Sequence, residues 1–167
     1  MPDDWIRQWG DPVLRESAAP VASFDDLLRK EASRLTGRLD EADGAGLAAT
    51  QVGFMRRLFA FRISLDTEID VLVNPVVAAA SDERTEFLEG CLSYQSVVVT
   101  VERPVAVRVE AQTLSGRPRV LEVEGYEASL LQHEIDHLDG ILTLDRAHPL
   151  ERRRAMAALM DTNRQAA

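Results

Sequence analysis

The stretch QHEIDHLDG at residues 132–140 constrains the fold of this chain more than any other feature. An α-helix repeats about every 3.6 residues, so His133 and His137 would lie one turn apart on one face. Two neutral imidazoles in this arrangement can bind one divalent metal ion, and Glu134 can act beside it as general base and general acid. Apolar residues in the same stretch predict a packed helix, and Gly140 suits the position after its end.

Two histidines leave a catalytic metal site one protein ligand short, because such sites usually have three protein ligands and a water. A metzincin would continue with a third histidine, but the residue three places after Gly140 is Thr143. Glu151 is the candidate for a thermolysin-like third ligand. The softer candidate is Cys91, the only cysteine of the chain, which lies in the stretch EGCLS at residues 89–93. The residues alone leave the choice between these two side chains open.

Composition limits the class of protein. The 167 residues suit one domain with a substantial core, and no apolar run approaches the roughly 18 residues of a membrane helix. The acidic, polar start predicts neither a signal peptide nor a transit peptide. One cysteine cannot form an internal disulfide, which fits a reducing compartment, and we expect a cytoplasmic protein. The net charge of −9 argues against a nucleic-acid-binding surface, so neither sequence-specific nucleic-acid binding nor a membrane partner is expected.

Local patterns predict helices at both ends of the chain. Residues 1–22 carry turn signals and predict an extended N-terminal arm. Apolar residues at helical spacing predict a helix from about Phe24 to Asp40. Pro149 favours a first helical turn, and it is expected to open a C-terminal helix over residues 149–163. His148, just before this helix, is expected to be a cap or surface residue.

The middle of the chain predicts strands. Short β-branched or aromatic runs indicate strands at residues 57–63, 71–77 and 96–102. Asn74-Pro75 is expected to end the second of these or to place it at a sheet edge. Alternating valines at 105–109 and a matching run after residues 115–118 predict a hairpin. Together these elements predict an α+β fold for residues 1–167: one domain, with mixed or antiparallel sheets packed around the histidine helix.

The stretch GAGLAATQVG at residues 44–53 is dense in small residues, which let a backbone pass close to another group. By itself it predicts a tight loop between a helix and a strand. It is not a phosphate-binding loop, because no Gly-Lys-Ser/Thr follows.

Three stretches together resemble, in order and spacing, the signature motifs of the peptide deformylases. They are GAGLAATQ at 44–51, EGCLS at 89–93 and QHEIDH at 132–137. The stretch WGDPVLR at 9–15 also resembles the N-terminal arm of that family. The resemblance runs from about residue 8 to about residue 150.

The resemblance implies that Cys91, His133 and His137 hold one divalent metal ion. It makes Glu134 the general base and acid, and it implies an oxyanion hole formed by the side-chain amide of Gln51 and the backbone N–H of Leu92. Family members work naturally with Fe²⁺, so Fe²⁺ is the expected ion, and Ni²⁺, Co²⁺ or Zn²⁺ can replace it in purified protein.

The same resemblance implies the substrate. Family members remove the N-formyl group from the initiator formyl-methionine of new bacterial proteins, so the expected partner is an N-formyl-methionyl peptide or nascent chain. The implied substrate-binding residues are Ala45, Gly46, Glu89, Gly90, Tyr126, Ser129 and Leu130. Phe87 and Leu88 are expected near the same pocket, and Glu89 is expected to tie loops together beside it.

This chain departs from the family pattern after the cysteine motif. Residues 94–101 read YQSVVVTV, without the proline and the substrate-binding arginine that family members commonly carry there. Ala45 also stands where the family often has a larger aliphatic residue. We therefore expect weakened or altered binding of the peptide beyond its first residue. The alternatives are an N-formyl hydrolase for a non-standard or small-molecule substrate, and a catalytically weak or regulatory homologue.

Arg152, Arg153 and Arg154 follow Pro149 in the C-terminal helix. One interpretation is a solvated helix face. The other is docking near the ribosomal exit, because members of the resembled family use a basic C-terminal helix in this way.

Overall fold

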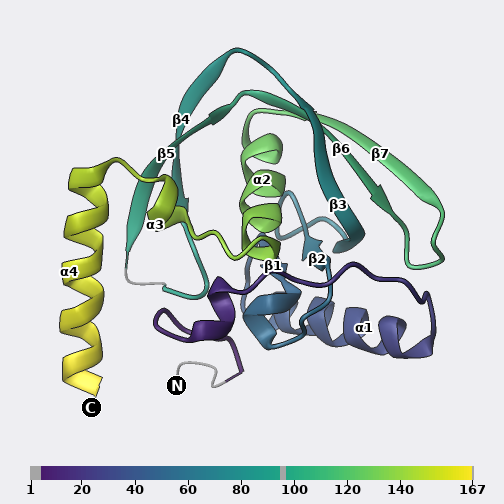
Figure 1. Cartoon of the computed structure of the whole chain (residues 1–167), viewed down its shortest axis with the longest axis horizontal. Coiled ribbons are helices and arrows are strands. Elements are labelled where there is room, and N and C mark those ends of the chain that lie inside the picture. The colour runs from purple at the N-terminus through teal and green to yellow at the C-terminus, as the bar shows by residue number, and fades with distance from the viewer. Residues whose placement is uncertain (1–4, 95–96, 167) are drawn as a thin grey trace.

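The computed structural model describes residues 5–94 and 97–166 (Figure 1). Among these residues, one α-helix precedes the strands in the chain and three follow them, and the first of these three lies at the centre of the molecule. The elements in chain order are η1 (Pro12–Arg15), α1 (Asp26–Glu41), β1 (Gly46–Ala48), η2 (Ala49–Val52), β2 (Leu58–Phe61), β3 (Asp70–Ala80), β4 (Arg84–Gly90), β5 (Val98–Pro104), β6 (Ala106–Gln112), β7 (Pro118–Glu124), α2 (Tyr126–Leu138), α3 (Thr143–Arg146) and α4 (Pro149–Ala166).

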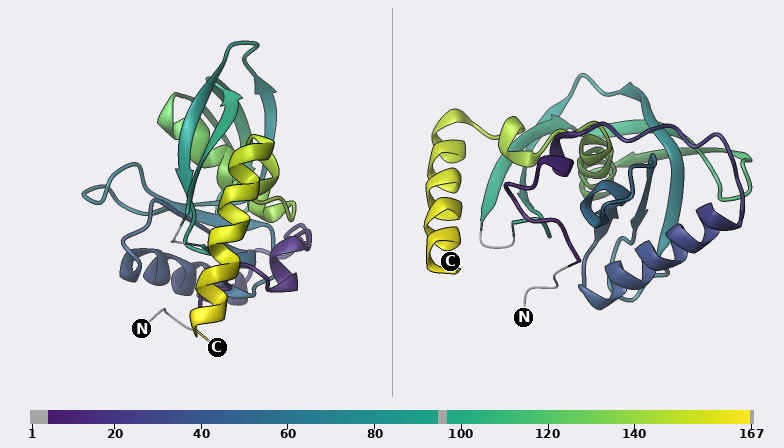
Figure 2. Two further views of the ribbon diagram at one scale, coloured as in Figure 1. Left: turned by 90° about the vertical axis from the view of Figure 1, so that its left-hand side faces the viewer. Right: turned by 60° about the horizontal axis from the view of Figure 1, so that its bottom comes forward.

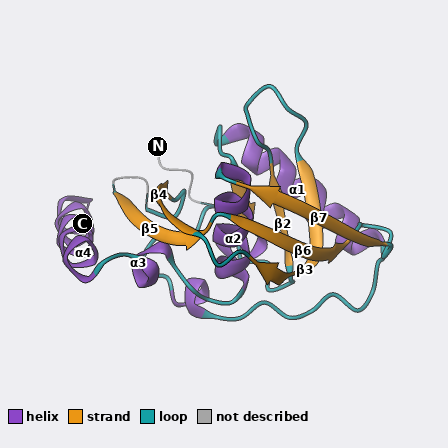
Figure 3. Ribbon diagram, turned by 90° about the horizontal axis from the view of Figure 1, so that it is seen from above, coloured by secondary structure: helices purple, strands orange, loops and turns teal. Residues whose placement is uncertain are grey.

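The strands form two antiparallel sheets. One has five strands in the order β1-β2-β3-β6-β7, and the other consists of β4 and β5. Helix α2 lies between the two sheets, as Figures 1 and 3 show from the front and from above. The predicted α+β fold, with sheets packed around the histidine helix, is therefore confirmed. Among the described residues, no helix is long and apolar enough to cross a membrane.

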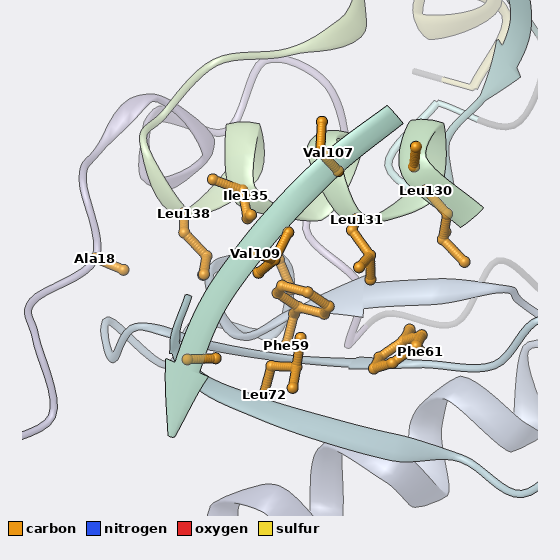
Figure 4. Close-up of a cluster of buried hydrophobic side chains, with 13 residues drawn as sticks. Ala18, Phe59, Phe61, Leu72, Val107, Val109, Leu130, Leu131, Ile135 and Leu138 are labelled. Atoms are coloured by element: carbon orange, nitrogen blue, oxygen red, sulfur yellow. The ribbon is translucent and has the colours of Figure 1, made fainter. Parts of the chain in front are cut away.

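Helix α2 begins and ends at glycines with positive φ, Gly125 (φ 61°) and Gly140 (φ 72°). Its apolar side chains pack on the inner face of the five-stranded sheet (Figure 4). Leu131, Ile135 and Leu138 recur at helical spacing and contribute to a cluster with Phe59 and other sheet residues. Every side chain from 128 to 138 is buried, so α2 is enclosed on all sides and carries its polar residues into the core.

The other helices cover the outside. Helix α1 starts after Asp25, whose side chain accepts a hydrogen bond from the Leu28 backbone N–H at 2.9 Å, and its apolar face packs on β2 and β3. Helix α4 lies at the periphery, beside β5 (Figure 2). Its Ala155 and Leu159 belong to a third apolar cluster that also contains Cys91. His148 lies at the start of α4, where its Nδ1 accepts from the Leu150 N–H at 3.4 Å.

Strand β3 does not end at Asn74-Pro75. It shifts register between Val73 and Val76, where Asn74 adopts φ 50°, and it continues to Ala80. β2 pairs only with residues 70–73, so the later half of β3 pairs with β6 alone and the expected sheet edge begins here. The Asn74 amide is bonded to the backbone of Val21, at 2.7 and 2.9 Å, and ties the N-terminal segment to the sheet.

Two short strands differ from the sequence-based expectation. The small-residue stretch is not a simple loop, because Gly46–Ala48 pairs with β2 as strand β1 and the 3₁₀ helix η2 follows it. Strand β4 covers Arg84–Gly90 and pairs with β5 along its whole length. Both segments therefore owe their extended form to a partner strand distant in the sequence.

Gly140 and Gly37 provide a matched pair for testing the end of α2. A Cβ on Gly140 would lie 2.5 Å from the Arg15 carbonyl oxygen, at a backbone φ that disfavours L side chains. We expect Gly140→Ala to lower the free energy of unfolding by about 2 kcal/mol or more. A Cβ on Gly37, in α1, meets nothing within 4 Å. Gly37→Ala should raise stability by roughly 0.5–1 kcal/mol.

Urea unfolding of both variants measures these changes. Equal effects of the two substitutions would contradict the requirement for glycine at the end of α2.

Candidate metal centre

Three donor atoms converge at the centre of the molecule. Cys91 directly follows β4, and His133 and His137 lie one turn apart on α2. Their ligand atoms all lie within 4.8 Å of one another, and Cys91 Sγ is 3.2 Å from His137 Nε2. All three residues are buried. The structure thus brings together the residues that the sequence assigned to the metal.

Glu151, the other candidate ligand, lies elsewhere. Its Oε2 accepts a hydrogen bond from the Thr100 backbone N–H at 2.7 Å, which joins the start of α4 to β5. The thermolysin-like assignment is therefore wrong. The donor set of one thiol and two imidazoles fits a divalent transition metal, because soft sulfur and imidazole nitrogen are the ligands that such ions favour.

The sulfur of Cys91 lies in a polar setting. The Ser93 backbone N–H donates to Sγ at 3.4 Å, and the Gln51 side-chain amide lies 3.6 Å from Sγ. The same amide donates to Ser93 Oγ at 3.0 Å, while its oxygen accepts from the Ala48 N–H at 2.8 Å. These contacts hold the Gln51 amide beside the sulfur.

Glu89 holds His133 from the side opposite the sulfur. Its Oε2 lies 3.0 Å from His133 Nδ1, and its two oxygens accept from Arg103 at 2.5 and 3.0 Å. Ser129 Oγ donates to the same carboxylate at 2.9 Å. Burial raises the pKa of Glu89, but the hydrogen bonds from His133 and Arg103 outweigh burial and lower the pKa to about 2. Glu89 is thus a carboxylate that orients the His133 ring.

Glu134 faces the strand β1. A Cβ on Gly46 would lie 2.2 Å from Glu134 Oε1, so this position accommodates only glycine when the carboxyl group is in place. Glu134 is 2% exposed, and its Oε2 has no hydrogen-bond partner among the described residues. Burial raises its pKa from 4.5 to about 7. A carboxyl group with such a pKa can both accept and donate a proton near neutral pH.

A cavity of about 380 Å³ opens over this cluster. Gln51, Cys91, Leu92, His133 and Glu134 contribute to its wall. The predicted substrate-binding residues all line it as well, and they are Ala45, Gly46, Glu89, Gly90, Tyr126, Ser129 and Leu130, together with Phe87 and Leu88. The residues that line the cavity include no lysine or arginine.

These observations can be set beside known proteins. The model of the polypeptide deformylase family matches residues 3–153. The chain belongs to the polypeptide deformylase family.

Individual family members cover almost the whole chain. The peptide deformylase of Thermotoga neapolitana is 40% identical over 156 residues, covering 93% of this chain and 94% of the relative. That of Natranaerobius thermophilus is 44% identical over 147 residues, covering 88% and 94%. The crystal structure of a peptide deformylase from Legionella pneumophila has a TM-score of 0.90 at 38% identity, covering 96% of this chain and 95% of that one.

Two residues of this deformylase site were not singled out from the sequence. Arg103 and Asp136 are 3% and 7% exposed and lie 2.9 Å apart, from Nη1 to Oδ2, and Arg103 also holds Glu89. Asp136 carried a signal, since an acidic residue between two histidines on a buried helix requires a cation. No signal in the sequence distinguishes Arg103 from other arginines on strands.

The stretch 94–101, which lacks the family's proline and arginine, is only partly described, because Gln95 and Ser96 lie outside the described residues. Tyr94 is buried, and its hydroxyl bonds to Thr143 Oγ1 on α3. Val98 is 55% exposed and pairs with Gly90, which lines the cavity. An apolar side chain therefore lies near the mouth of the cavity.

Glu134 should make the stability of the metal-free protein depend on pH. Its pKa is about 7 in the folded state against an ordinary 4.5, so the folded protein holds the proton more tightly than the unfolded chain. This stabilisation is fully present below about pH 4.5 and is lost as the pH rises through about 7. The free energy of unfolding of the wild type should therefore fall by on the order of 2 kcal/mol as the pH rises. We expect Glu134→Gln, which resembles the protonated form, to show no such fall.

Urea unfolding at about pH 5 and about pH 8 measures this change. Glu124→Gln, at an exposed position on β7, is the control and should unfold as the wild type does at both values. The same pH dependence in wild type and Glu134→Gln would contradict a raised pKa.

Proposed function

We propose that this protein is a metal-dependent peptide deformylase. It hydrolyses the N-formyl amide of formyl-methionyl N-termini on newly made proteins and releases formate. The observation that carries this proposal is the convergence of Cys91, His133 and His137 beside the buried carboxyl group of Glu134, at the wall of one cavity. Family membership supports it independently.

Hydrolysis of a formamide needs an activated water, a stabilised oxyanion and a proton for the leaving amine. A divalent ion held by Cys91, His133 and His137 would polarise the formyl oxygen and lower the pKa of the attacking water toward about 7. Glu134 accepts the proton of that water and then donates it to the amine nitrogen. Its pKa of about 7 suits both directions of transfer.

The oxyanion is assigned to two donors beside the thiolate. The Gln51 amide is held within 3.6 Å of Cys91 Sγ, and the Leu92 backbone N–H follows the cysteine directly. A donor aimed at a developing oxyanion typically contributes about 2.7–4 kcal/mol. The methionine side chain is assigned to the cavity, with walls formed by Ala45, Gly46, Glu89, Gly90, Tyr126, Ser129 and Leu130.

The proposed resident ion is Fe²⁺, with Ni²⁺, Co²⁺ or Zn²⁺ as substitutes in purified protein. A thiolate donates more charge than a neutral imidazole and leaves the ion less electrophilic, so the identity of the metal should affect activity. An iron–thiolate site should also lose activity on exposure to oxygen or peroxide. A nascent-chain substrate places the enzyme in the cytoplasm.

The cavity also supports an alternative substrate. No lysine or arginine lines it, and Leu88 and Tyr126 at its wall are 76% and 55% exposed. Such a rim has no cation for a peptide carboxylate or an acidic side chain. This observation favours a deformylase with altered peptide preference, and it keeps open an N-formyl hydrolase for a non-standard or small-molecule substrate. A regulatory homologue is disfavoured, because the proposed ligands, the carboxyl group and the amide are all in place.

We further propose that the C-terminal helix docks near the ribosomal exit. Arg152, Arg153 and Arg154 are exposed, whereas Ala155 and Leu159 of the same helix are buried against the cluster that contains Cys91. Replacing the three arginines by glutamine therefore removes charge from the exposed face of α4, and it also removes the contact of Arg152 Nη2 with Asp145 Oδ1 on α3, at 3.4 Å. We expect weaker co-sedimentation with ribosomes, especially at low salt, and unchanged release of formate from short peptides.

A matched triple variant at the exposed Arg84, Arg108 and Arg117 removes the same charge elsewhere. Ribosome binding that falls equally in both triple variants would assign the effect to net charge rather than to α4.

Release of formate tests the enzyme assignment. Anaerobically purified protein should release formate from formyl-Met-Ala-Ser and should not cleave the unblocked peptide. Glu134→Ala should lower turnover by about 10²-fold or more while metal content persists. Cys91→Ser should weaken metal binding or change which metal is retained. Formate release from a formylated small molecule but not from any formyl-methionyl peptide would favour the alternative substrate.

A rate on formyl-Met-Ala-Ser equal to that of an ordinary bacterial deformylase would refute the altered peptide preference alone. Full turnover by Glu134→Ala would refute the proposed proton carrier.

A further inference from the structure

A chain of charged side chains connects His133 with the surface of the protein. Arg146, on α3, donates to both oxygens of Asp136, from Nη2 at 2.6 Å and from Nε at 3.1 Å. Arg103 donates to Asp136 at 2.9 Å and to both oxygens of Glu89. Glu89 in turn lies 3.0 Å from His133 Nδ1.

The members of this chain differ in exposure. Glu89, Arg103 and Asp136 have side chains that are 6%, 4% and 9% exposed, whereas the side chain of Arg146 is 46% exposed. The outer end of this chain of charged side chains, at Arg146, is therefore open to solvent. The three inner side chains are enclosed by α2 and the strands around it.

Positive and negative charges alternate along this chain of side chains, and the two arginines offset the two carboxylates. Because the interior screens charge weakly, loss of one member leaves a buried charge without compensation. Without Arg146, the Asp136 carboxylate would keep Arg103 as its bonded arginine and would draw that guanidinium away from Glu89. The Glu89 carboxylate would then lose the bidentate contact that fixes its plane.

We propose that Arg146 is a positioning residue for the metal centre. It holds Asp136, and through Asp136 and Arg103 it fixes the carboxylate that orients the His133 ring. Partners that hold the second nitrogen of a ligating histidine set the direction and basicity of the first. The inference rests on the proposed role of His133 as a metal ligand. It also means that α3, whose residues do not line the substrate cavity, contributes to the geometry of the site.

Arg119 and Asp70 provide a matched control. Arg119 donates two hydrogen bonds to the two oxygens of Asp70, at 2.9 and 2.5 Å, and its side chain is 34% exposed. Both pairs are bidentate, but Arg119 uses Nη1 and Nη2 whereas Arg146 uses Nε and Nη2. The arginines are 34% and 46% exposed, and the Asp70 side chain is 41% exposed against 9% for Asp136. Neither residue contacts Glu89 or the cluster of Cys91 and the two histidines.

The test measures Co²⁺ binding by the full chain carrying Arg146→Ala or Arg119→Ala. The dissociation constant is obtained by competition with a metal-chelating dye, and the absorption spectrum of the Co²⁺ protein reports the ligand geometry. Loss of a direct partner of a ligating histidine typically weakens metal binding by about 10–100-fold. Arg146 lies three bonded partners beyond Glu89, the direct partner of His133. We expect Arg146→Ala to weaken Co²⁺ binding by about threefold to tenfold and to shift the absorption bands.

Arg119→Ala should leave both measurements unchanged. Arg146→Lys keeps the charge but cannot bridge both oxygens of Asp136, so it should weaken binding in the same direction and by less. This variant decides the question if Arg146→Ala does not fold. In a double-mutant cycle on Co²⁺ affinity, adding Arg146→Ala to Asp136→Asn should weaken binding little further, because the proposed effect passes through Asp136.

Co²⁺ affinity and spectrum equal to wild type in both Arg146 variants would overturn this inference, as would effects matched by Arg119→Ala. His133→Ala separates the two proposals. If it abolishes Co²⁺ binding while the Arg146 variants bind as the wild type does, only the inference on Arg146 fails. If His133→Ala binds Co²⁺ as the wild type does, the proposed ligand set fails, and the inference fails with it.

Discussion

The structure depends on the burial of a polar helix. Helix α2 is enclosed between two sheets, and Gln132, His133, Glu134, Asp136 and His137 are all buried along it. A polar group taken out of water without a hydrogen-bond partner costs at least about 1–3 kcal/mol, and a charged group costs more. The elements around α2 supply partners for His133 and Asp136, since β4 brings Glu89, β5 brings Arg103 and α3 brings Arg146.

The same burial accounts for the chemistry that we propose. Glu134 Oε2 has no hydrogen-bond partner among the described residues, and burial raises the pKa of this carboxyl group into the range useful for proton transfer. Glu89 lies beside His133, is paired with Arg103 and stays ionised. Two buried carboxyl groups in one site thus differ in protonation because one faces an arginine and the other faces glycine and the cavity.

Several elements of the fold depend on local sequence patterns, and these patterns predict them. The α1 helix, the β6–β7 hairpin and the end of α2 at Gly140 each depend on residues close in the chain. Strands β1 and β4 were missed, because neither shows an alternating pattern and each is extended only through its partner strand. Asn74-Pro75 was expected to end β3 or to place it at a sheet edge. The strand continues through a register shift, and its pairing with β2 stops at Val73, so only the second expectation holds.

The sequence by itself determined the spacing of His133 and His137, the acid between them and the family motifs, because helix geometry converts a spacing of four residues into one shared face. Those motifs also implied Cys91 as the third ligand. Only the tertiary structure decided that Cys91 lies beside the two histidines while Glu151 lies elsewhere, and that Arg103 and Arg146 extend the cluster to the surface. The physical reason is distance along the chain. Cys91 lies 46 residues from His137, and such contacts arise from packing of the whole domain rather than from local propensity.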